Sequence, residues 1–284
     1  MNHSRRIARP TALILGTNEI ASAVAVSMRR AGYACVLSHD RFPPVIRRGM
    51  AYHDTLFGER IALAGVEGRR AESSAEIFAA LDDPEAVAVT PLTVSDLIAL
   101  RLPDALIDAR MQKYSVTPDW RHIARVTVGL GPNFAVGINC DIAIETRPDH
   151  VGRILQRGET EPGDHSPREL GGVGAERFVY ADFDAPWHTA LDIGARVFRG
   201  MVIGRLGGTP VTAPRDGVLR GVVRDGLSAF AGAKLLEIDP RGRAAAWKGI
   251  DERGQRIARA VVEAVRLKQA EREARFVTAP LGMQ

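Results

Sequence analysis

Short apolar runs alternate with helical patterns over the first half of the chain. Residues 11–16 have the pattern of a buried strand, residues 19–30 place alanines, valines and a methionine on a helix that Gly32 can end, and residues 33–38 give the next strand. This strand–helix–strand order favours a parallel sheet.

Capping signals indicate two further helices. Ser73 precedes Glu76 by three residues ahead of an apolar run, and Thr93 precedes Asp96 at the same spacing. Apolar runs at residues 86–89, 105–109, 126–130 and 142–145 supply the remaining strands. We therefore predict a Rossmann-like α/β domain with a mostly parallel sheet over residues 10–147.

The second half of the chain contains an internal repeat, in which residues 181–206 align with residues 213–238. Two similar halves with short strands predict a small all-β domain, a pseudo-two-fold sandwich, over residues 177–240. Residues 148–176 are rich in glycine, proline and charge, which predicts a loop or linker. Residues 241–284 are predicted to form a C-terminal helix and tail, because apolar positions recur every four residues from Ile257.

The stretch Gly208-Thr-Pro-Val-Thr-Ala-Pro-Arg-Asp-Gly resembles the lipoyl/biotinyl-type barrel-sandwich hybrid. In carrier domains of that type, the hairpin between the two halves bears the modified lysine. Here the hairpin reads Gly207-Gly208-Thr209, so we expect no covalent biotin or lipoate. We expect instead a module that packs against the first domain, dimerises into a homo-oligomer or covers a ligand.

Composition and charge narrow the function classes. No apolar run reaches the roughly eighteen residues of a membrane span, and no export signal is visible, so we expect a cytoplasmic protein without membrane contact. The net charge of +4 is carried by scattered arginines, and only 6% of residues are aromatic, which argues against nucleic-acid binding. A modest positive charge carried by arginines suits a small anionic ligand, because a guanidinium group binds phosphate or carboxylate oxygens.

Cysteine and histidine, the residue types that most often bind metals, do not cluster in the sequence. Cys35 and Cys140 lie far apart in strand-like runs, and their spacing to histidines fits no metal site. We predict no metal site and assign no catalytic residue.

Anion-suited loops follow several of the predicted strands. Because the carboxyl ends of parallel strands meet at one edge of a sheet, and ligands of open α/β sheets bind there, we expect these loops to form one site. Glycine-rich turns expose backbone amides, and arginines suit phosphate oxygens. The candidate cofactor-binding residues are Gly16, Asn18, Asp40, Arg47, Arg48, Asp108, Arg110, Lys113, Gly129, Gly131, Asn133, Gly137, Glu145 and His150.

The first of these loops lies where a dinucleotide fingerprint would lie, with Asp40 near the ribose position. However, the second and third glycines of the fingerprint are replaced by Asn18 and Ala21. Helix amides could still hold a phosphate. NAD binding, another phosphorylated ligand and a ligand-free fold all stay open at this point.

Taken in order, these motifs resemble the selenium-dependent molybdenum hydroxylase system protein family, which is distantly akin to maturation factors of xanthine and carbon monoxide dehydrogenases. The resemblance implies an accessory protein without catalysis of its own that binds a molybdopterin-type cofactor, or a related phosphorylated pterin or nucleotide, for a client molybdoenzyme or cofactor-biosynthesis protein. The matching stretches are Pro44-Val-Ile-Arg-Arg, Val66-Glu-Gly, Asp108-Ala-Arg-Met-Gln-Lys, Val128-Gly-Leu-Gly-Pro-Asn-Phe, Glu145-Thr-Arg, His150-Val-Gly-Arg, Gly171-Gly172, Glu176-Arg177 and residues 213–240.

The departures from this family fall on the loops expected to face the ligand. Asn18-Glu19 stands for Gly-Asp, Gly131-Pro-Asn133 for Gly-Pro-Gly, and Arg147-Pro-Asp-His150 for Arg-Gly-His. Two alternatives therefore stay open. One is an NAD(P)-linked oxidoreductase or cofactor-biosynthesis enzyme that uses the same cleft, and the other is a ligand-free structural adaptor for a partner enzyme.

Overall fold

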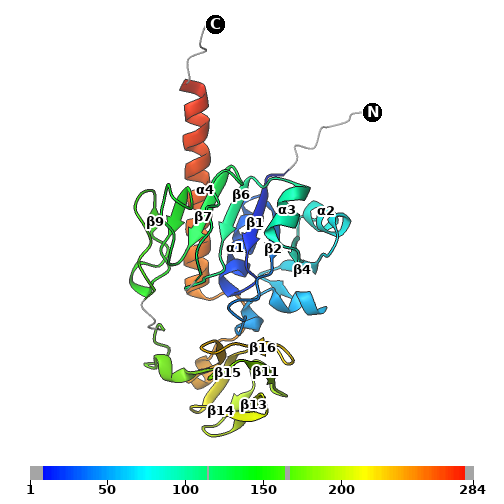
Figure 1. Cartoon of the computed structure of the whole chain (residues 1–284), viewed down its shortest axis with the longest axis vertical. Helices are drawn as coiled ribbons and strands as arrows, with labels where there is room; N and C mark the ends of the chain where they lie inside the picture. Colours follow the sequence, from blue (N-terminus) through cyan, green and yellow to red (C-terminus); the bar gives the residue numbers. More distant parts are fainter. Residues whose placement is uncertain (1–8, 114, 164–166, 279–284) are drawn as a thin grey trace.

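The structure is a computed structural model that describes residues 9–113, 115–163 and 167–278, with side chains up to residue 274. It has a mixed α/β architecture, with one nine-stranded, mostly parallel sheet and two four-stranded antiparallel sheets (Figure 1). The predicted α/β class with a mostly parallel sheet is therefore confirmed.

The large sheet has the strand order β3-β4-β5-β2-β1-β6-β7-β8-β9. Its seven central strands run parallel, and the short strands at both edges pair antiparallel with their neighbours. The strands are β1 (Thr11–Leu15), β2 (Ala34–Ser38), β3 (Ala62–Leu63), β4 (Val66–Arg70), β5 (Ala86–Thr90), β6 (Ala105–Asp108), β7 (Val126–Leu130), β8 (Ile142–Ile144) and β9 (Ile154–Leu155).

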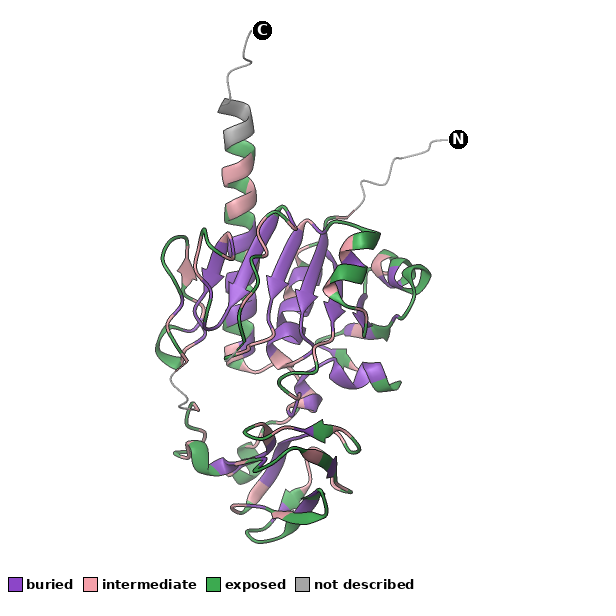
Figure 2. Ribbon diagram, in the orientation of Figure 1, coloured by how far each residue is buried: buried purple, intermediate pink, exposed green. Residues whose placement is uncertain are grey.

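Helices cover both faces of this sheet. Ala12 and Ile14 of β1 face the layer of α1 (Glu19–Arg30) and α4 (Glu252–Thr278), whereas Leu13 and Leu15 face α2 (Ser74–Asp82) and α3 (Val94–Leu100). Because successive strand residues point to opposite faces, both sides of β1 are apolar and buried (Figure 2). The predicted apolar stripe of the C-terminal helix is also confirmed, since Ile257, Val261 and Val265 are buried in the same core.

Residues 178–239 form the two antiparallel sheets, here called the β module. One sheet has the order β10-β17-β15-β12 and the other β14-β13-β11-β16. The strands are β10 (Phe178–Tyr180), β11 (Ala185–His188), β12 (Arg196–Val197), β13 (Val202–Leu206), β14 (Thr209–Thr212), β15 (Gly217–Val222), β16 (Ser228–Ala229) and β17 (Lys234–Asp239). The repeat in the sequence aligns β10, β11, β12 and β13 with β14, β15, β16 and β17. When each strand is replaced by its counterpart in the repeat, the strand order of one sheet becomes that of the other.

The β module lies at the edge of the large sheet where the parallel strands end (Figure 1). The segment after β2 makes the contact: Ile46 packs in the apolar core of the β module, and its carbonyl accepts a hydrogen bond of 2.8 Å from the Val222 amide. The rings of Phe42 and Phe230 lie 4.3 Å apart between centroids. Short helical turns complete the fold: η1 (Arg48–Met50), η2 (His53–Phe57), η3 (Pro148–His150), η4 (Ala175–Arg177) and η5 (Gly242–Ala244).

Across the described ranges, no helix combines the length and the apolar character needed to cross a membrane.

Candidate functional site

An ion-pair network joins the sheet edge to the β module at Arg47. Its Nε donates to Oε2 of Glu237 at 2.6 Å, and its Nη1 donates to Oε1 of Glu19, at the start of α1, at 2.9 Å. Glu237 is fully buried and also accepts from Nε of Arg177 at 3.1 Å. Burial alone would raise the pKa of Glu237, but the charges of Arg47, Arg220 and Arg177 hold that pKa below its usual value.

The neighbouring Arg48 is engaged in the same way. Its guanidinium donates to Asp54 at 2.5 Å, to Asp192 of the β module at 2.7 Å and to the Val222 carbonyl at 3.0 Å. The arginine pair predicted to bind ligand therefore ties the segment after β2 to the β module.

Two other cations near Arg47 form no ion pair with a carboxylate in the described part of the chain. Lys234, the first residue of β17, and Arg253, in the first turn of α4, are both half-buried, and within the described ranges neither forms an ion pair with a carboxylate. The Arg253 guanidinium donates to the Thr146 carbonyl at the end of β8 at 3.1 Å. Burial lowers the pKa of Arg253, the charge of Glu19 opposes this shift, and the charge of Arg47 adds to it.

The Lys234 ammonium lies over an aromatic ring. Its Nζ is 4.0 Å from the ring centroid of Phe178, and the Arg177 guanidinium carbon lies 4.4 Å from the same centroid. Burial lowers the pKa of Lys234 to about 8. The charges of Arg47 and Lys113 also lower it, against the opposing effect of Glu237 and Glu19. Burial and the two cations together thus outweigh the two carboxylates in setting the pKa of Lys234.

Three of the predicted residues, Asp40, Asp108 and Arg110, lie together where β2 and β6 end, on either side of β1. Arg110 forms a two-pronged pair with Asp108 at 2.7 and 3.0 Å and reaches Asp40 at 3.3 Å. The Trp120 indole donates to Asp108 at 2.9 Å, and the Gln112 amide donates to Asp40 at 3.0 Å. These carboxylates are satisfied within the protein.

The first loop is closed by internal contacts. The Asn18 Oδ1 caps α1 by accepting from the amides of Ile20 and Ala21 at 2.9 Å, while its Nδ2 donates to the Ala109 carbonyl at 2.8 Å. Gly16 has a φ of +105°, and a Cβ there would lie 3.2 Å from the same carbonyl. Asn18 thus explains how this loop folds without the glycines of a dinucleotide fingerprint.

The glycines after β7 have separate roles. A Cβ at Gly129 would lie 2.1 Å from the Phe134 ring, so this position is fixed by packing, while Gly131 and Gly137 have φ angles of +90° and +80° at turns. The Asn133 amide donates to the carbonyl of Lys113 at 3.2 Å, which joins two of the predicted loops.

The predicted residues after β8 form their own cluster. Glu145 is buried, and its carboxylate accepts from the amides of Thr146, Arg147 and Glu161 at 2.7–2.9 Å. His150 contacts the Glu161 carboxylate through Nδ1 at 2.8 Å. These contacts fold the loop that leaves the sheet.

A buried polar cluster that the sequence analysis did not single out lies at the ends of β1 and β2. The Thr17 hydroxyl is 3.0 Å from Nδ1 of His53 and 3.4 Å from Nδ1 of His39. Burial, with the charges of His39, Arg48 and Arg224, lowers the pKa of His53 to about 3. His53 is therefore neutral, and its Nε2 is buried without a hydrogen-bond partner in the described part of the chain.

Neither a metal centre nor a reactive thiol emerges from the described residues, where no three histidine, cysteine or acidic side chains group as metal ligands would. Cys35 and Cys140 are buried, and burial raises the pKa of each thiol to about 12, so both are protonated at neutral pH.

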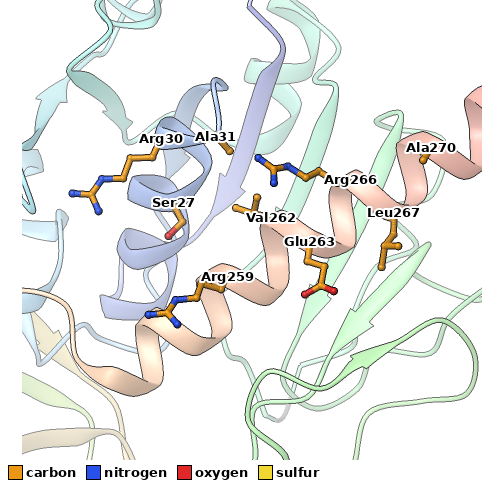
Figure 3. A pocket seen from close by; sticks show the side chains of 9 residues that line it. All are labelled: Ser27, Arg30, Ala31, Arg259, Val262, Glu263, Arg266, Leu267 and Ala270. Carbon is orange, nitrogen blue, oxygen red and sulfur yellow. The ribbon is translucent and has the colours of Figure 1, made fainter.

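A second basic surface lies on the outer side of the helices. A groove between α1 and α4 is lined by Arg30, Arg259 and Arg266 around Val262 and Leu267 (Figure 3). Arg259, Arg266 and Leu267 are exposed there, whereas Lys234 and Arg253 are withdrawn from water. The half-buried cations at the sheet edge are therefore the stronger candidate for a binding site.

No family model matches the sequence. The uncharacterized protein YqeB of Escherichia coli (strain K12) is 30% identical over 254 residues, which cover 89% of this chain and 47% of YqeB. The chain thus spans about half the length of that relative. The predicted membership of the selenium-dependent molybdenum hydroxylase system family stays a prediction.

Similar chains among solved structures include the ectoine utilization protein EutE (DoeB) from Ruegeria pomeroyi, in apo and product-bound forms, and a succinylglutamate desuccinylase from Silicibacter sp. TM1040. They are 13–14% identical, cover 81–82% of this chain and 85–86% of their own, and have TM-scores of 0.24–0.26. At these values the likeness assigns no activity to this chain.

These neighbours correct one expectation. The sequence predicts an accessory or maturation protein for a molybdenum-cofactor enzyme, and this prediction is wrong, because the matching structures are an ectoine utilization protein and a desuccinylase.

Proposed function

We propose that the protein binds a small anionic ligand, carrying phosphate or carboxylate groups, between the carboxyl edge of the large sheet and the β module. The observation that carries this proposal is the pair of half-buried cations, Lys234 and Arg253, neither of which forms an ion pair with a carboxylate in the described part of the chain.

Withdrawing a charge from water is unfavourable unless the charge is paired. Lys234 and Arg253 are half-buried, and Arg47 repels both, whereas Glu19, which pairs with Arg47, attracts both from a distance. An anion between them would relieve this repulsion and use both donor types, the planar fork of an arginine and the point charge of a lysine. Relief of this repulsion is thus a source of affinity for an anion.

We further propose that residues 177–240 form a barrel-sandwich domain that covers this ligand, next to a Rossmann-like domain over residues 10–147. The repeated sheet order and the hairpin at Gly207 and Gly208, between β13 and β14, support this assignment. Because that hairpin has no lysine, the role of the β module is to supply Lys234 and the buried Glu237 to the site.

The test is isothermal titration calorimetry with inorganic pyrophosphate. The wild type is expected to bind with a Kd below about 1 mM, and Lys234→Met and Arg253→Gln are each expected to weaken binding by about tenfold, the loss of one charge-assisted contact. Arg256→Gln, an exposed position three residues further along α4, is the matched control and keeps wild-type affinity. Absence of binding to the wild type, or equal affinity in all folded variants, contradicts the proposal.

A further inference from the structure

Lys234 differs chemically from the other lysines of the chain. The sequence has only four lysines, at positions 113, 234, 248 and 268. Lys113 and Lys248 are exposed, and Lys268 pairs with Glu271 at 2.9 Å. Lys234 alone is half-buried among positive charges, over an aromatic ring and without a described carboxylate partner.

We infer that Lys234 is a nucleophilic amine that forms an imine with the carbonyl group of an anionic aldehyde or ketone bound at this site. The inference rests on the proposed anion-binding function and adds a class of ligand to it. The Arg253 guanidinium would hold the anionic group, and the β17 backbone would hold the amine beside the carbonyl carbon.

The surroundings of Lys234 explain why its amine would react. A lysine attacks a carbonyl only in its neutral form, and desolvation next to other cations favours that form. With a pKa of about 8, roughly a quarter of Lys234 is neutral at pH 7.5, against about 0.1% for a lysine at its ordinary value.

The step balances without an oxidant or a reductant. The Nζ lone pair forms a bond to the carbonyl carbon, the carbonyl oxygen takes one proton from the amine and one from solvent and leaves as water, and a protonated carbon–nitrogen double bond remains. The protonated imine restores a positive charge near the Phe178 ring, where the ammonium lay.

The experiment uses a matched pair of aldehyde probes, glyceraldehyde 3-phosphate and uncharged glyceraldehyde, each with cyanoborohydride to trap the imine. Peptide mass mapping then measures the modification rate of each lysine in the full-length protein. We expect glyceraldehyde 3-phosphate to modify Lys234 at least tenfold faster than Lys113, Lys248 or Lys268, and pyrophosphate to protect it. Lys234→Arg should remove this fast modification, whereas Lys248→Arg, at an exposed lysine outside the site, should leave both the fast modification of Lys234 and pyrophosphate binding unchanged.

The outcomes separate this inference from the proposed function. If pyrophosphate binds but Lys234 reacts no faster than exposed Lys248, the imine is overturned and the anion site stands. If pyrophosphate does not bind and both aldehydes modify Lys234 equally, the anion site fails, and with it the anionic class of carbonyl ligand.

Discussion

Arg47 and Glu237 are 190 positions apart in the sequence and form an ion pair of 2.6 Å, with the glutamate fully buried. This pair connects the segment after β2 to the central strand β17 of the β module. Because Glu237 also accepts from Arg177, one carboxylate holds two arginines in place. Lys234, three residues earlier on the same strand, takes its position from this connection.

Glu237→Gln is expected to destabilise the protein strongly. The substitution leaves Arg47 and Arg177 without their shared negative charge, and breaking a buried pair on one side typically costs about 3–5 kcal/mol. Urea unfolding followed by circular dichroism measures the effect. Glu67→Gln, in an exposed pair with Arg69, should change stability by less than about 1 kcal/mol. Equal urea midpoints for the two variants would show that the Glu237 network does not stabilise the fold.

Anion affinity should fall as the pH rises through about 8. The lowered pKa of Lys234 means that its ammonium is present below that pH and is lost above it, with Arg47, Lys113, Glu237 and Glu19 as the charges that act on it. Sulfate keeps the same charge over this range, so its affinity should fall about tenfold between pH 7 and pH 9. In Lys234→Arg the affinity should be nearly constant over this range. A wild-type profile as flat as that of the variant would contradict the role of Lys234.

Gly129→Ala should destabilise the protein by about 1–3 kcal/mol, because the new methyl group collides with the Phe134 ring. If packing is the reason for the glycine, the cost of the substitution should fall by at least half in a Phe134→Ala background. Chemical unfolding of the four proteins gives this coupling. An unchanged cost in both backgrounds would point to another constraint on Gly129.

Asn18→Ala should lower stability by about 1 kcal/mol through loss of the α1 cap, and Asn18→Asp should lower it less, because the carboxylate keeps an acceptor for the helix amides. Thermal unfolding distinguishes the two variants. If they melt alike and below the wild type, the bond from Nδ2 to the Ala109 carbonyl is the contact that matters.

Local signals predicted most of the large sheet. The α1 bounds follow from Asn18 and Gly32, and the capping boxes at Ser73 and Thr93 are both present. Strand β4 was not predicted, because Val66-Glu-Gly-Arg-Arg has no apolar alternation. Its place beside β5 comes from tertiary pairing, and Gly68 packs against the Tyr52 ring.

The candidate site was predicted less well than the sheet, because its contacts join residues that are distant in the sequence. Arg47 and Arg110 were correctly placed at the carboxyl edge, but whether an arginine is paired depends on carboxylates such as Glu237 that are distant in sequence. Lys234 is a single cation at the start of an ordinary strand, and only the fold brings it near Arg47. The one signal that sequence could have offered is the scarcity of lysine in an arginine-rich chain.

The most direct test of the anion site is a crystal structure of the wild-type protein grown with pyrophosphate. We expect the ligand between the sheet edge and the β module, with its oxygens within hydrogen-bond distance of the Lys234 ammonium and the Arg253 guanidinium. If those two cations instead pair with carboxylates of the protein, and no ligand lies between them, the central claim is wrong.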